Sequence, residues 1–293
     1  MLSGKSLYIF IFFGLSFVTS FPIDLVGRAA FEFDIYDHNI KVENSNPGPG
    51  EQPWSKRKDL LIESIRNNTL ASPSLVGLQE VLHDQLVDIT SGLGGSWKSL
   101  GVGRDDGKEA GEYSPILYQD DVWENLNFTT YWLSPTPQVP SKGWDAKFNR
   151  IVSVAKFRHR ATGAQLHYLN THFDADGADA RLHSAQEVLS IIGNFTDPLP
   201  AYLSGDFNSQ PTEDAYKTIN GTLIDASTEK SLDTGFVETW TGFNNEKQKI
   251  IDFTFYQSDH QTTVINHDVL NSNFSGLLIS DHRPLLTKFS LNY

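Results

Sequence analysis

Several short apolar runs in this chain end in polar side chains, and this repeated pattern constrains its fold more than any other feature. Leu75-Val-Gly-Leu-Gln leads into Glu80, Leu203-Ser-Gly into Asp206, and Gly276-Leu-Leu-Ile into Ser280-Asp281-His282. Short apolar runs bounded by turn residues are typical of buried strands. The pattern therefore predicts strands with carboxylates, amides and imidazoles at or near their ends.

Strand-like segments outnumber helix-like segments. Helical periodicity predicts helices over residues 56–66, 83–90, 178–194 and 212–219. Strands are predicted over 31–35, 74–78, 114–118, 128–133, 151–158, 165–170, 201–203, 251–256, 263–270 and 284–291. A parallel doubly wound fold needs a helix after nearly every strand. This order instead predicts an α/β (α+β) structure, in which two mainly antiparallel sheets pack together beneath covering helices.

Residues 1–20 have the composition of a secretory signal peptide. Lys5 precedes an apolar run from Leu7 to Val18, which is short for a membrane span, and small residues follow for cleavage. N-glycosylation sequons follow at Asn67, Asn127, Asn194, Asn220 and Asn273. We therefore expect a secreted, N-glycosylated protein with no transmembrane segment after signal cleavage, an uncleaved anchor being the alternative. No repeat or linker divides residues 21–293, which are expected to form a single domain.

Charge and cysteine content exclude several classes of site. The net charge is −13, and loss of residues 1–20, whose only charged residue is Lys5, leaves −14. Such a surface repels polyanions and argues against a strong non-specific grip on nucleic acid. A nuclease is still allowed, because a bound divalent cation changes the local field. The chain has no cysteine, which excludes disulfides, thiolate metal sites and cysteine nucleophiles.

Polar residues at alternate positions are candidates for chemistry. Asp206 and Asn208 face the same way on an extended segment, where they can orient a water and donate to a phosphoryl oxygen. The alternative, which these residues favour when taken alone, is an Asp-Phe-Asn turn. Asn170, His172 and Asp174 repeat the spacing, and a solvent-facing strand edge is the alternative there.

Glu80 closes its apolar run, where a carboxylate is suited to a hard cation such as Mg²⁺, although a lone glutamate at a strand end is usually just solvated. Taken together, the motifs supply oxygen ligands, imidazoles and amide donors. These are the groups needed for metal-assisted displacement at phosphorus.

The order of these motifs resembles that of the exonuclease–endonuclease–phosphatase superfamily, which includes pancreatic-type deoxyribonucleases, abasic-site endonucleases, deadenylases, inositol polyphosphate phosphatases and neutral sphingomyelinases. The matching motifs are, in order, Asn39, Gln79-Glu80, Asn170-Thr-His172, Gly205-Asp206-Phe-Asn208, Ile251-Asp252 and Ser280-Asp281-His282. The resemblance covers nearly the whole mature chain, from about Phe31 to Leu291, and implies a four-layer α/β sandwich, with two sheets inside and helices outside.

The resemblance also implies roles around a metal ion. Glu80 resembles the principal Mg²⁺ ligand, with Asn39 and Asp281 close to the metal and Mn²⁺ as the alternative ion. His282 resembles the general base or, in other accounts of the family, an imidazole that contacts phosphate. Asp252 resembles the carboxylate that orients His282.

The resemblance also implies roles for residues that act on the attacking water or the substrate phosphate. Asp206 is expected to position the attacking water and Asn208 to stabilise the transition-state oxygens. His172 resembles a second histidine that contacts phosphate, and Glu112, in a segment similar to that of deoxyribonuclease-like members, is its expected partner. Arg150 stands where the family often places a phosphate-contacting arginine.

One position departs from the family pattern. Relatives usually carry small or hydroxyl residues before the first-strand asparagine, whereas this chain has Asp37-His38. By strand alternation Asp37 shares the face of Asn39, where it either adds a carboxylate near the metal or weakens the assignment of Asn39. We expect a mild perturbation rather than loss of activity.

The sequence thus predicts a secreted Mg²⁺-dependent phosphoesterase that hydrolyses a phosphodiester or phosphomonoester by in-line attack of an activated water. Its substrate is either nucleic acid or a small organic phosphate, such as an inositol or sugar phosphate, and the acidic charge favours a short or small one. No stable protein partner is implied. The alternative from another class is a non-catalytic secreted binding protein on the same scaffold, which predicts a damaged catalytic position, and the motifs show none.

Overall fold

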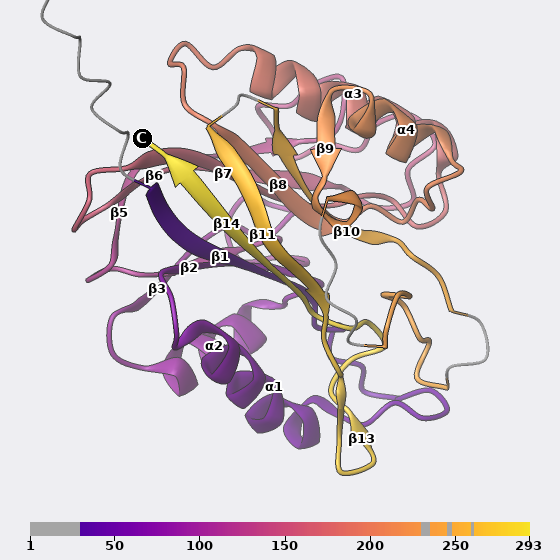
Figure 1. Cartoon of the computed structure of the whole chain (residues 1–293). Helices are drawn as coiled ribbons and strands as arrows, with labels where there is room; N and C mark the ends of the chain where they lie inside the picture. The colour runs from indigo at the N-terminus through magenta and orange to yellow at the C-terminus, as the bar shows by residue number, and fades with distance from the viewer. Residues whose placement is uncertain (1–29, 230–234, 245–247, 259–260) are drawn as a thin grey trace, which may run out of the picture.

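The computed structural model describes residues 30–229, 235–244, 248–258 and 261–293, so the predicted signal peptide, residues 1–20, lies outside the described residues. Two large sheets pack face to face (Figure 1). The first contains, from edge to edge, β11 (Thr262–Val269), β14 (Leu285–Asn292), β1 (Ala30–Asn39), β2 (Ser74–Gln79), β4 (Ile116–Gln119) and β3 (Trp97–Leu100). The second contains β5 (Trp123–Trp132), β6 (Ile151–His159), β7 (Gln165–His172), β8 (Ala201–Asp206), β10 (Asp252–Gln257) and β9 (Leu223–Asp225).

Each sheet is antiparallel except at one central pair of strands. β1 and β2 are parallel in the first sheet, and β7 and β8 are parallel in the second. The remaining neighbours pair antiparallel. The prediction of two mainly antiparallel sheets is therefore confirmed. Because parallel strands end at the same edge of a sheet, the two central pairs bring four strand ends to one side of the molecule.

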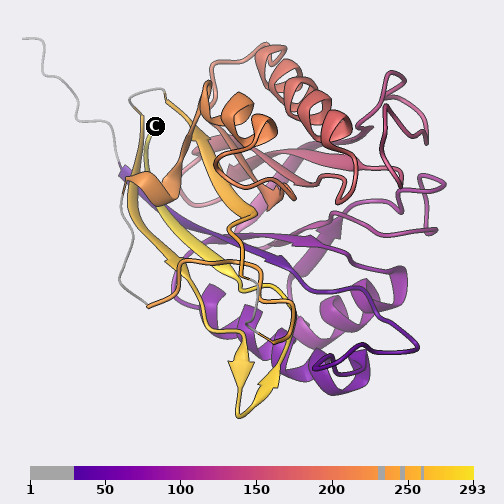
Figure 2. The same cartoon turned by 90° about the vertical axis from the view of Figure 1, so that its right-hand side faces the viewer.

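Helices cover the outer face of each sheet, as Figures 1 and 2 show. α1 (Trp54–Thr69) and α2 (His83–Leu93) cover the first sheet, and α3 (Ala178–Gly193) and α4 (Asp214–Asn220) cover the second. A third apolar cluster fills the space between the sheets, where Phe33, Trp123, Phe157 and Phe289 are fully buried. This is the four-layer sandwich that the sequence predicts. None of the helices in the described residues is long and apolar enough to cross a bilayer.

The Ser280-Asp281-His282 motif does not follow a buried strand, so that part of the prediction is wrong. Leu277–Leu278 is a two-residue strand, β13, that pairs with β12 (Asn273–Phe274) in a small hairpin. The hairpin turns through Ser275 and Gly276, which both have positive φ. Ile279 then packs into the cluster beneath α1 and α2, and the motif precedes β14 rather than ending a strand.

Glu187 on α3 carries a buried carboxylate oxygen that finds no hydrogen-bond partner within the described residues. Burial raises the pKa of Glu187 to about 7, well above its ordinary value of 4.5. The folded state therefore holds this proton more tightly than the unfolded chain does, and stability is lost as pH rises from about 4.5 through 7. Because the side chain is only half-buried, the expected loss is about 1–2 kcal/mol.

Glu187→Gln is expected to remove this loss, so that the variant is more stable than the wild type at pH 8 and similar to it at pH 4.5. Urea unfolding at both pH values checks the result, with Glu63→Gln on the exposed face of α1 as the control. Equal stabilisation of the Glu187 variant at both pH values would contradict the pKa argument.

Candidate active site

Polar residues from both sheets meet where β1, β2, β7 and β8 end. In Figure 1 β1 runs from left to right, and Figure 2 brings the side on which it ends to the front. Asn39, the last residue of β1, joins the two sheets, because its amide nitrogen donates to Glu80 Oε1 at 3.1 Å and to Asp206 Oδ2 at 3.0 Å. Gly205, just before Asp206 on β8, lies against β7, where a Cβ would lie 2.1 Å from the Thr171 carbonyl oxygen.

Glu80 follows β2 in a left-handed conformation, with φ of 57°. Its Oε2 accepts a hydrogen bond from the backbone N–H of Val42 at 3.0 Å and lies 3.5 Å from Lys41 Nζ. Burial alone would raise the pKa of Glu80, but Lys41 and the Val42 N–H outweigh burial and lower it. Glu80 is therefore a partly buried carboxylate held in its charged form.

His282 and Asp252 form a buried hydrogen-bonded pair. His282 Nδ1 lies 2.9 Å from both Asp252 carboxylate oxygens, and the Thr239 hydroxyl donates to Asp252 Oδ2 at 2.5 Å. The imidazole of His38 contacts the carbonyl oxygen of His282 at 3.2 Å. Burial lowers the pKa of His282, but the carboxylates of Asp252 and Asp206 outweigh burial and raise it above its ordinary value. This geometry can hold the imidazole in one orientation, as expected for an Asp–His pair.

Asp206 lies between the two histidines. Its Oδ2 is 3.7 Å from His282 Nε2 and 3.4 Å from His172 Nε2. Burial and the neighbouring Asp252 raise the pKa of Asp206, while His282 opposes them. Asp206, Asp252 and His282 together offer ligand atoms within 4.8 Å of one another. His282 Nδ1 already bonds to Asp252, however, so we interpret this trio as an Asp–His pair with a second carboxylate beside it.

Asn208 does not continue the strand, so the prediction of an extended Asp206–Asn208 segment is wrong. Asn208 has φ of 45°, and its N–H donates to Asp206 Oδ1 at 2.8 Å, which forms the Asx turn that was the alternative. The turn still directs the Asn208 amide to the site, where its Nδ2 lies 3.1 Å from His172 Nε2 and donates to the Phe173 carbonyl at 3.1 Å. The Asx turn therefore still allows Asn208 to take part in the candidate site.

Glu112 is bonded mainly to a residue other than the one predicted. Its two carboxylate oxygens accept hydrogen bonds from Arg104 at 2.7 and 2.9 Å, and its distance to His172 Nδ1 is 3.9 Å. Glu112 thus approaches His172 within ion-pair range without a hydrogen bond. Burial and the nearby guanidinium groups of Arg150 and Arg104 lower the pKa of His172 well below its ordinary value. His172 is accordingly a neutral imidazole in this environment.

Arg150 lies close to the same histidine and is almost fully buried. Its Nε lies 3.2 Å from Asp174 Oδ2, and its Nη1 is buried with no partner within the described residues. Asp174 therefore faces a specific partner rather than solvent, which rejects the solvent-facing alternative for this residue. A buried guanidinium with an unused N–H is suited to donate to an oxygen of a bound anion.

Asp37 lies below the site, between the two sheets. Its Oδ1 accepts hydrogen bonds from Gln79 at 2.8 Å and Ser204 at 2.7 Å, and burial raises its pKa well above the ordinary value. Gln79 in turn donates to Asn170 Oδ1 at 2.7 Å. Asn39 keeps its contacts with Glu80 and Asp206, so Asp37 does not displace it. Asp37 is part of a buried network that supports the strand ends.

Four residues near the site were not predicted to take part in it: Lys41, Arg104, Thr239 and Trp240. Lys41 is the cation nearest Glu80, and Trp240 Nε1 donates to Asp281 Oδ2 at 3.3 Å. Lys41 directly follows the Asn39-Ile40 pair in sequence, so its place near the site could have been predicted from its distance to Asn39 along the chain. Thr239 and Trp240 lie in a loop with no recognisable motif, so only the fold reveals their contacts.

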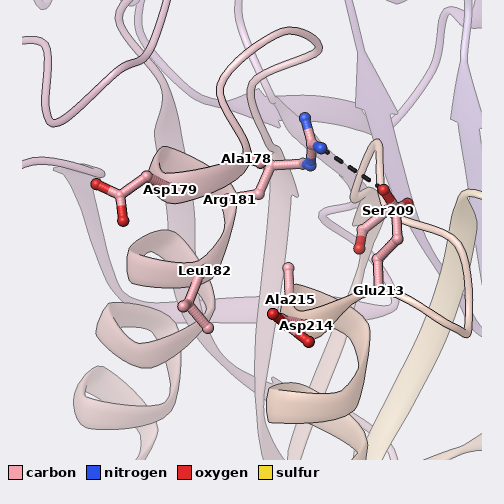
Figure 3. Close-up of a pocket in the computed structure, with 8 residues that line it drawn as sticks. All are labelled: Ala178, Asp179, Arg181, Leu182, Ser209, Glu213, Asp214 and Ala215. Carbon is pink, nitrogen blue, oxygen red and sulfur yellow. Dashed lines mark ion pairs between the residues drawn. The ribbon is translucent and has the colours of Figure 1, made fainter.

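A cavity of about 380 Å³ lies beside the site, between the N-terminal ends of α3 and α4 (Figure 3). Ser209, the residue after Asn208, is part of its lining. Figure 3 shows the Arg181 guanidinium directed at Glu213, and these groups are 3.7 Å apart. Asp179 and Asp214 also line the cavity. Because carboxylates outnumber cations there, the cavity is a poor place for phosphate and a better one for an uncharged part of a ligand.

The donor set fits a hard divalent cation. Glu80, Asp206, Asp252 and Asp281 place four carboxylates in one region, and the cationic groups in contact with them are Lys41 and His282. Burial and neighbouring carboxylates raise the pKa values of Asp206 and Asp281, because negative charge there is incompletely balanced. Hard cations such as Mg²⁺ and Mn²⁺ prefer such oxygen ligands. Glu80, Asn39 and Asp281 remain the predicted ligands.

Comparisons with known proteins agree with this geometry. The sequence profile of the Endonuclease/Exonuclease/phosphatase family matches residues 38–282. An endonuclease/exonuclease/phosphatase structure from Bacteroides vulgatus is 34% identical, with a TM-score of 0.80, covering 90% of this chain and 99% of that one. The mannosyl-6-phosphatase Bt3783 from Bacteroides thetaiotaomicron is 29% identical, with a TM-score of 0.78, covering 88% of this chain and 99% of that one.

Curated relatives are more distant. Nocturnin from Rattus norvegicus is 24% identical over 271 residues, which are 82% of this chain and 59% of the relative. Nocturnin from Drosophila melanogaster is 25% identical over 181 residues, which are 57% of this chain and 26% of that relative. The chain thus spans less than two thirds of the length of these relatives. On the strength of the profile match and the shared fold, the chain belongs to the endonuclease/exonuclease/phosphatase family, whose members are phosphoric ester hydrolases.

Proposed function

We propose that this phosphoric ester hydrolase is a secreted, Mg²⁺-dependent phosphatase of small organic phosphates, with a sugar phosphate as the favoured class. The observation that carries the proposal is the meeting of Glu80, Asp206, Asp252 and His282 around Asn39 at the ends of the central strands. A carboxylate-rich cluster with an Asp–His pair and nearby amide and guanidinium donors has the groups for hydrolysis at phosphorus.

In the proposed reaction, water attacks phosphorus and the bond to the ester oxygen breaks on the opposite side. Asp206 and His282, 3.7 Å apart, orient this water, the Asp206 carboxylate takes up its proton, and Asp252 stabilises the positive charge on the His282 imidazole. The Asn208 amide donates to a phosphoryl oxygen, and the leaving oxygen takes up a proton from solvent. A divalent cation held by Glu80, Asn39 and Asp281 would neutralise charge on the phosphoryl group.

Arg150 and His172 supply the binding side of the proposed site. The unused, buried Nη1 of Arg150 is suited to donate to a phosphate oxygen, since forming that bond satisfies a donor that is otherwise unpaired. Glu112 is assigned here to hold Arg104 and to approach His172, rather than to touch the substrate. Within this scheme Arg150, His172 and Asn208 bind the phosphate, and Asp206 and His282 act on the water.

Charge and one relative support a small substrate. The net charge of −13 opposes binding of a long polyanion, which requires many lysines and arginines. The Bacteroides mannosyl-6-phosphatase shares the fold over 88% of this chain, and its name describes a phosphatase of a sugar phosphate.

Secretion is supported by surface placement of the sequons. The asparagines at 67, 127, 194, 220 and 273 are all exposed, as attachment of a glycan requires. Expression in a eukaryotic secretory host should yield a mature chain that begins near Phe21 and gains mobility after removal of N-glycans. An intact Met1 together with unchanged mobility would contradict secretion.

Substrate class is tested by kinetics on a panel of mannose 6-phosphate, an inositol monophosphate, single- and double-stranded DNA, and RNA in Mg²⁺. We expect the sugar or inositol phosphate to have the highest kcat/KM, with a shallow dependence on salt because few phosphates are bound. Faster cleavage of a polynucleotide, with a steep salt dependence, would overturn the proposed substrate in favour of a nuclease. Asp206→Asn is the control for contaminating hydrolases.

A further inference from the structure

Phe148 is an exposed aromatic residue beside the candidate site. Its side chain is 46% exposed, which is unusual for so large an apolar group, and it lies in the loop between β5 and β6. Its ring centroid is 4.9 Å from the guanidinium carbon of Arg104 and 5.9 Å from that of Arg150. Arg104 bonds to Glu112, and Glu112 in turn approaches His172. The Phe148 ring therefore lies next to the residues proposed to bind phosphate.

The backbone that carries Phe148 is firmly held. Asp174 Oδ2 accepts hydrogen bonds from the N–H groups of Lys147 at 3.1 Å and Phe148 at 3.3 Å, as well as from Arg150 Nε. Asn149 Nδ2 donates to the Arg104 carbonyl at 3.2 Å. Backbone hydrogen bonds and Arg150 lower the pKa of Asp174 to about 2 although burial opposes them, so this acceptor stays charged.

An exposed aromatic ring on a fixed loop is prepared to bind a ligand at little conformational cost. Arg104, Arg150 and Lys147, whose Nζ lies 5.6 Å from the ring centroid, contact the ring and hold it in place, while nearly half of the side chain stays exposed. A phosphate bound at Arg150 would place its ester group near the ring, where an apolar ring face can stack. An acyclic ester group offers no such face.

We propose that Phe148 is a specificity-determining residue, and that it stacks against a ring carried by the leaving group of the substrate. The chemistry it recognises is a ring with an apolar face bound to a phosphate, either a pyranose or a nucleobase-bearing nucleoside. This inference rests on the proposed function, because it assigns the subsite for the leaving group of the same phosphatase. It adds a preference for cyclic over acyclic phosphate monoesters.

Three substrates and three proteins test this subsite. The substrates are mannose 6-phosphate, AMP and glycerol 3-phosphate, which has no ring, and the proteins are the wild type, Phe148→Ala and Phe148→Tyr. We expect Phe148→Ala to raise KM for at least one ring-bearing substrate about tenfold, with little change in kcat, and to leave glycerol 3-phosphate within about twofold. Phe148→Tyr should restore the wild-type KM. The substrate with the larger loss identifies the ring as sugar or base.

A matched control separates stacking from a general loss of apolar surface. Leu70→Ala truncates another exposed apolar residue, which follows α1 at the far end of that helix, and should leave every KM unchanged. An equal change for all three substrates, or no change for any, would overturn the stacking role of Phe148. Thermal unfolding of each variant confirms that it is folded.

Failure of the proposed function is distinguishable from failure of this subsite. If the wild type hydrolyses none of the three esters, the proposed phosphatase activity is wrong, and calorimetric binding of mannose 6-phosphate and AMP then tests the ring contact alone. Weaker binding to Phe148→Ala than to the wild type supports the subsite. Equal binding, or none to either protein, overturns it.

Discussion

His282→Ala is expected to lower kcat for phosphate ester hydrolysis by about 10³-fold, within the usual range for a group that acts in acid–base catalysis, because the imidazole orients the attacking water beside Asp206. The imidazole is the only side chain that joins Asp252, at 2.9 Å, to Asp206, at 3.7 Å, within the described residues. Its loss leaves the attacking water without one of its two orienting groups. Asp252 retains its hydrogen bond from Thr239, so the buried carboxylate is not left without a partner.

The measurement is steady-state kinetics with saturating Mg²⁺, together with a thermal unfolding curve for each protein. His183→Ala on α3 is the matched control, since this histidine is more than one-third exposed and stacks on Trp144 away from the cluster. It should retain wild-type turnover. Wild-type turnover in a folded His282→Ala protein would remove His282 from the reaction.

Glu80→Gln is expected to raise the Mg²⁺ concentration that gives half-maximal activity by about 10- to 100-fold, comparable to the effect of other changes at metal sites. Glutamine keeps the size of the side chain and one oxygen to accept from Val42, but it removes the negative charge that attracts the cation. The charge on Lys41 is then unpaired, which weakens cation binding further.

A Mg²⁺ titration of activity measures this effect, and the Mg²⁺-induced rise in unfolding temperature measures binding without turnover. Both should shift in Glu80→Gln, whereas Glu63→Gln on the exposed face of α1 should match the wild type. If the two Mg²⁺ dependences of Glu80→Gln coincide with those of the wild type, Glu80 is not a metal ligand.

Much of the fold could be predicted because its strands and helices have strong patterns. The apolar runs before Glu80 and Asp206 correspond to β2 and β8, and the long periodic segment from Ala178 corresponds to α3. β3 and β9 were missed, since they are short and only partly apolar. The run before Ser280 was misplaced because two leucines suffice for a hairpin strand as well as for a buried one.

The residues of the candidate site could be predicted from the sequence, but their hydrogen-bond partners could not. Its members come from motifs that mark strand ends, and the structure brings Asn39, Glu80, Asp206 and His282 together. Partners depend on packing between distant segments, which no local pattern encodes. Glu112 therefore bonds to Arg104, eight residues earlier in the chain, rather than primarily to His172.

The sequence pattern also did not predict the backbone conformation at the site. Lys41, Glu80 and Asn208 all have positive φ, which is uncommon for residues other than glycine. Strand alternation assumes extended backbone, so it fails at these positions. Such conformations cluster at functional sites, where surrounding contacts hold them.

The central claim is that the buried cluster is a metal-dependent centre for phosphate ester hydrolysis. The most direct measurement is hydrolysis of p-nitrophenyl phosphate and bis-p-nitrophenyl phosphate by purified protein, first in Mg²⁺, then after EDTA, and again after excess Mg²⁺ is restored. We expect turnover that EDTA abolishes and that excess Mg²⁺ restores. Asp206→Asn should show no turnover under any of these conditions. Turnover that persists in EDTA, or no turnover of any ester by folded protein that binds Mg²⁺, would contradict the central claim, and the second result would favour a binding protein on this scaffold.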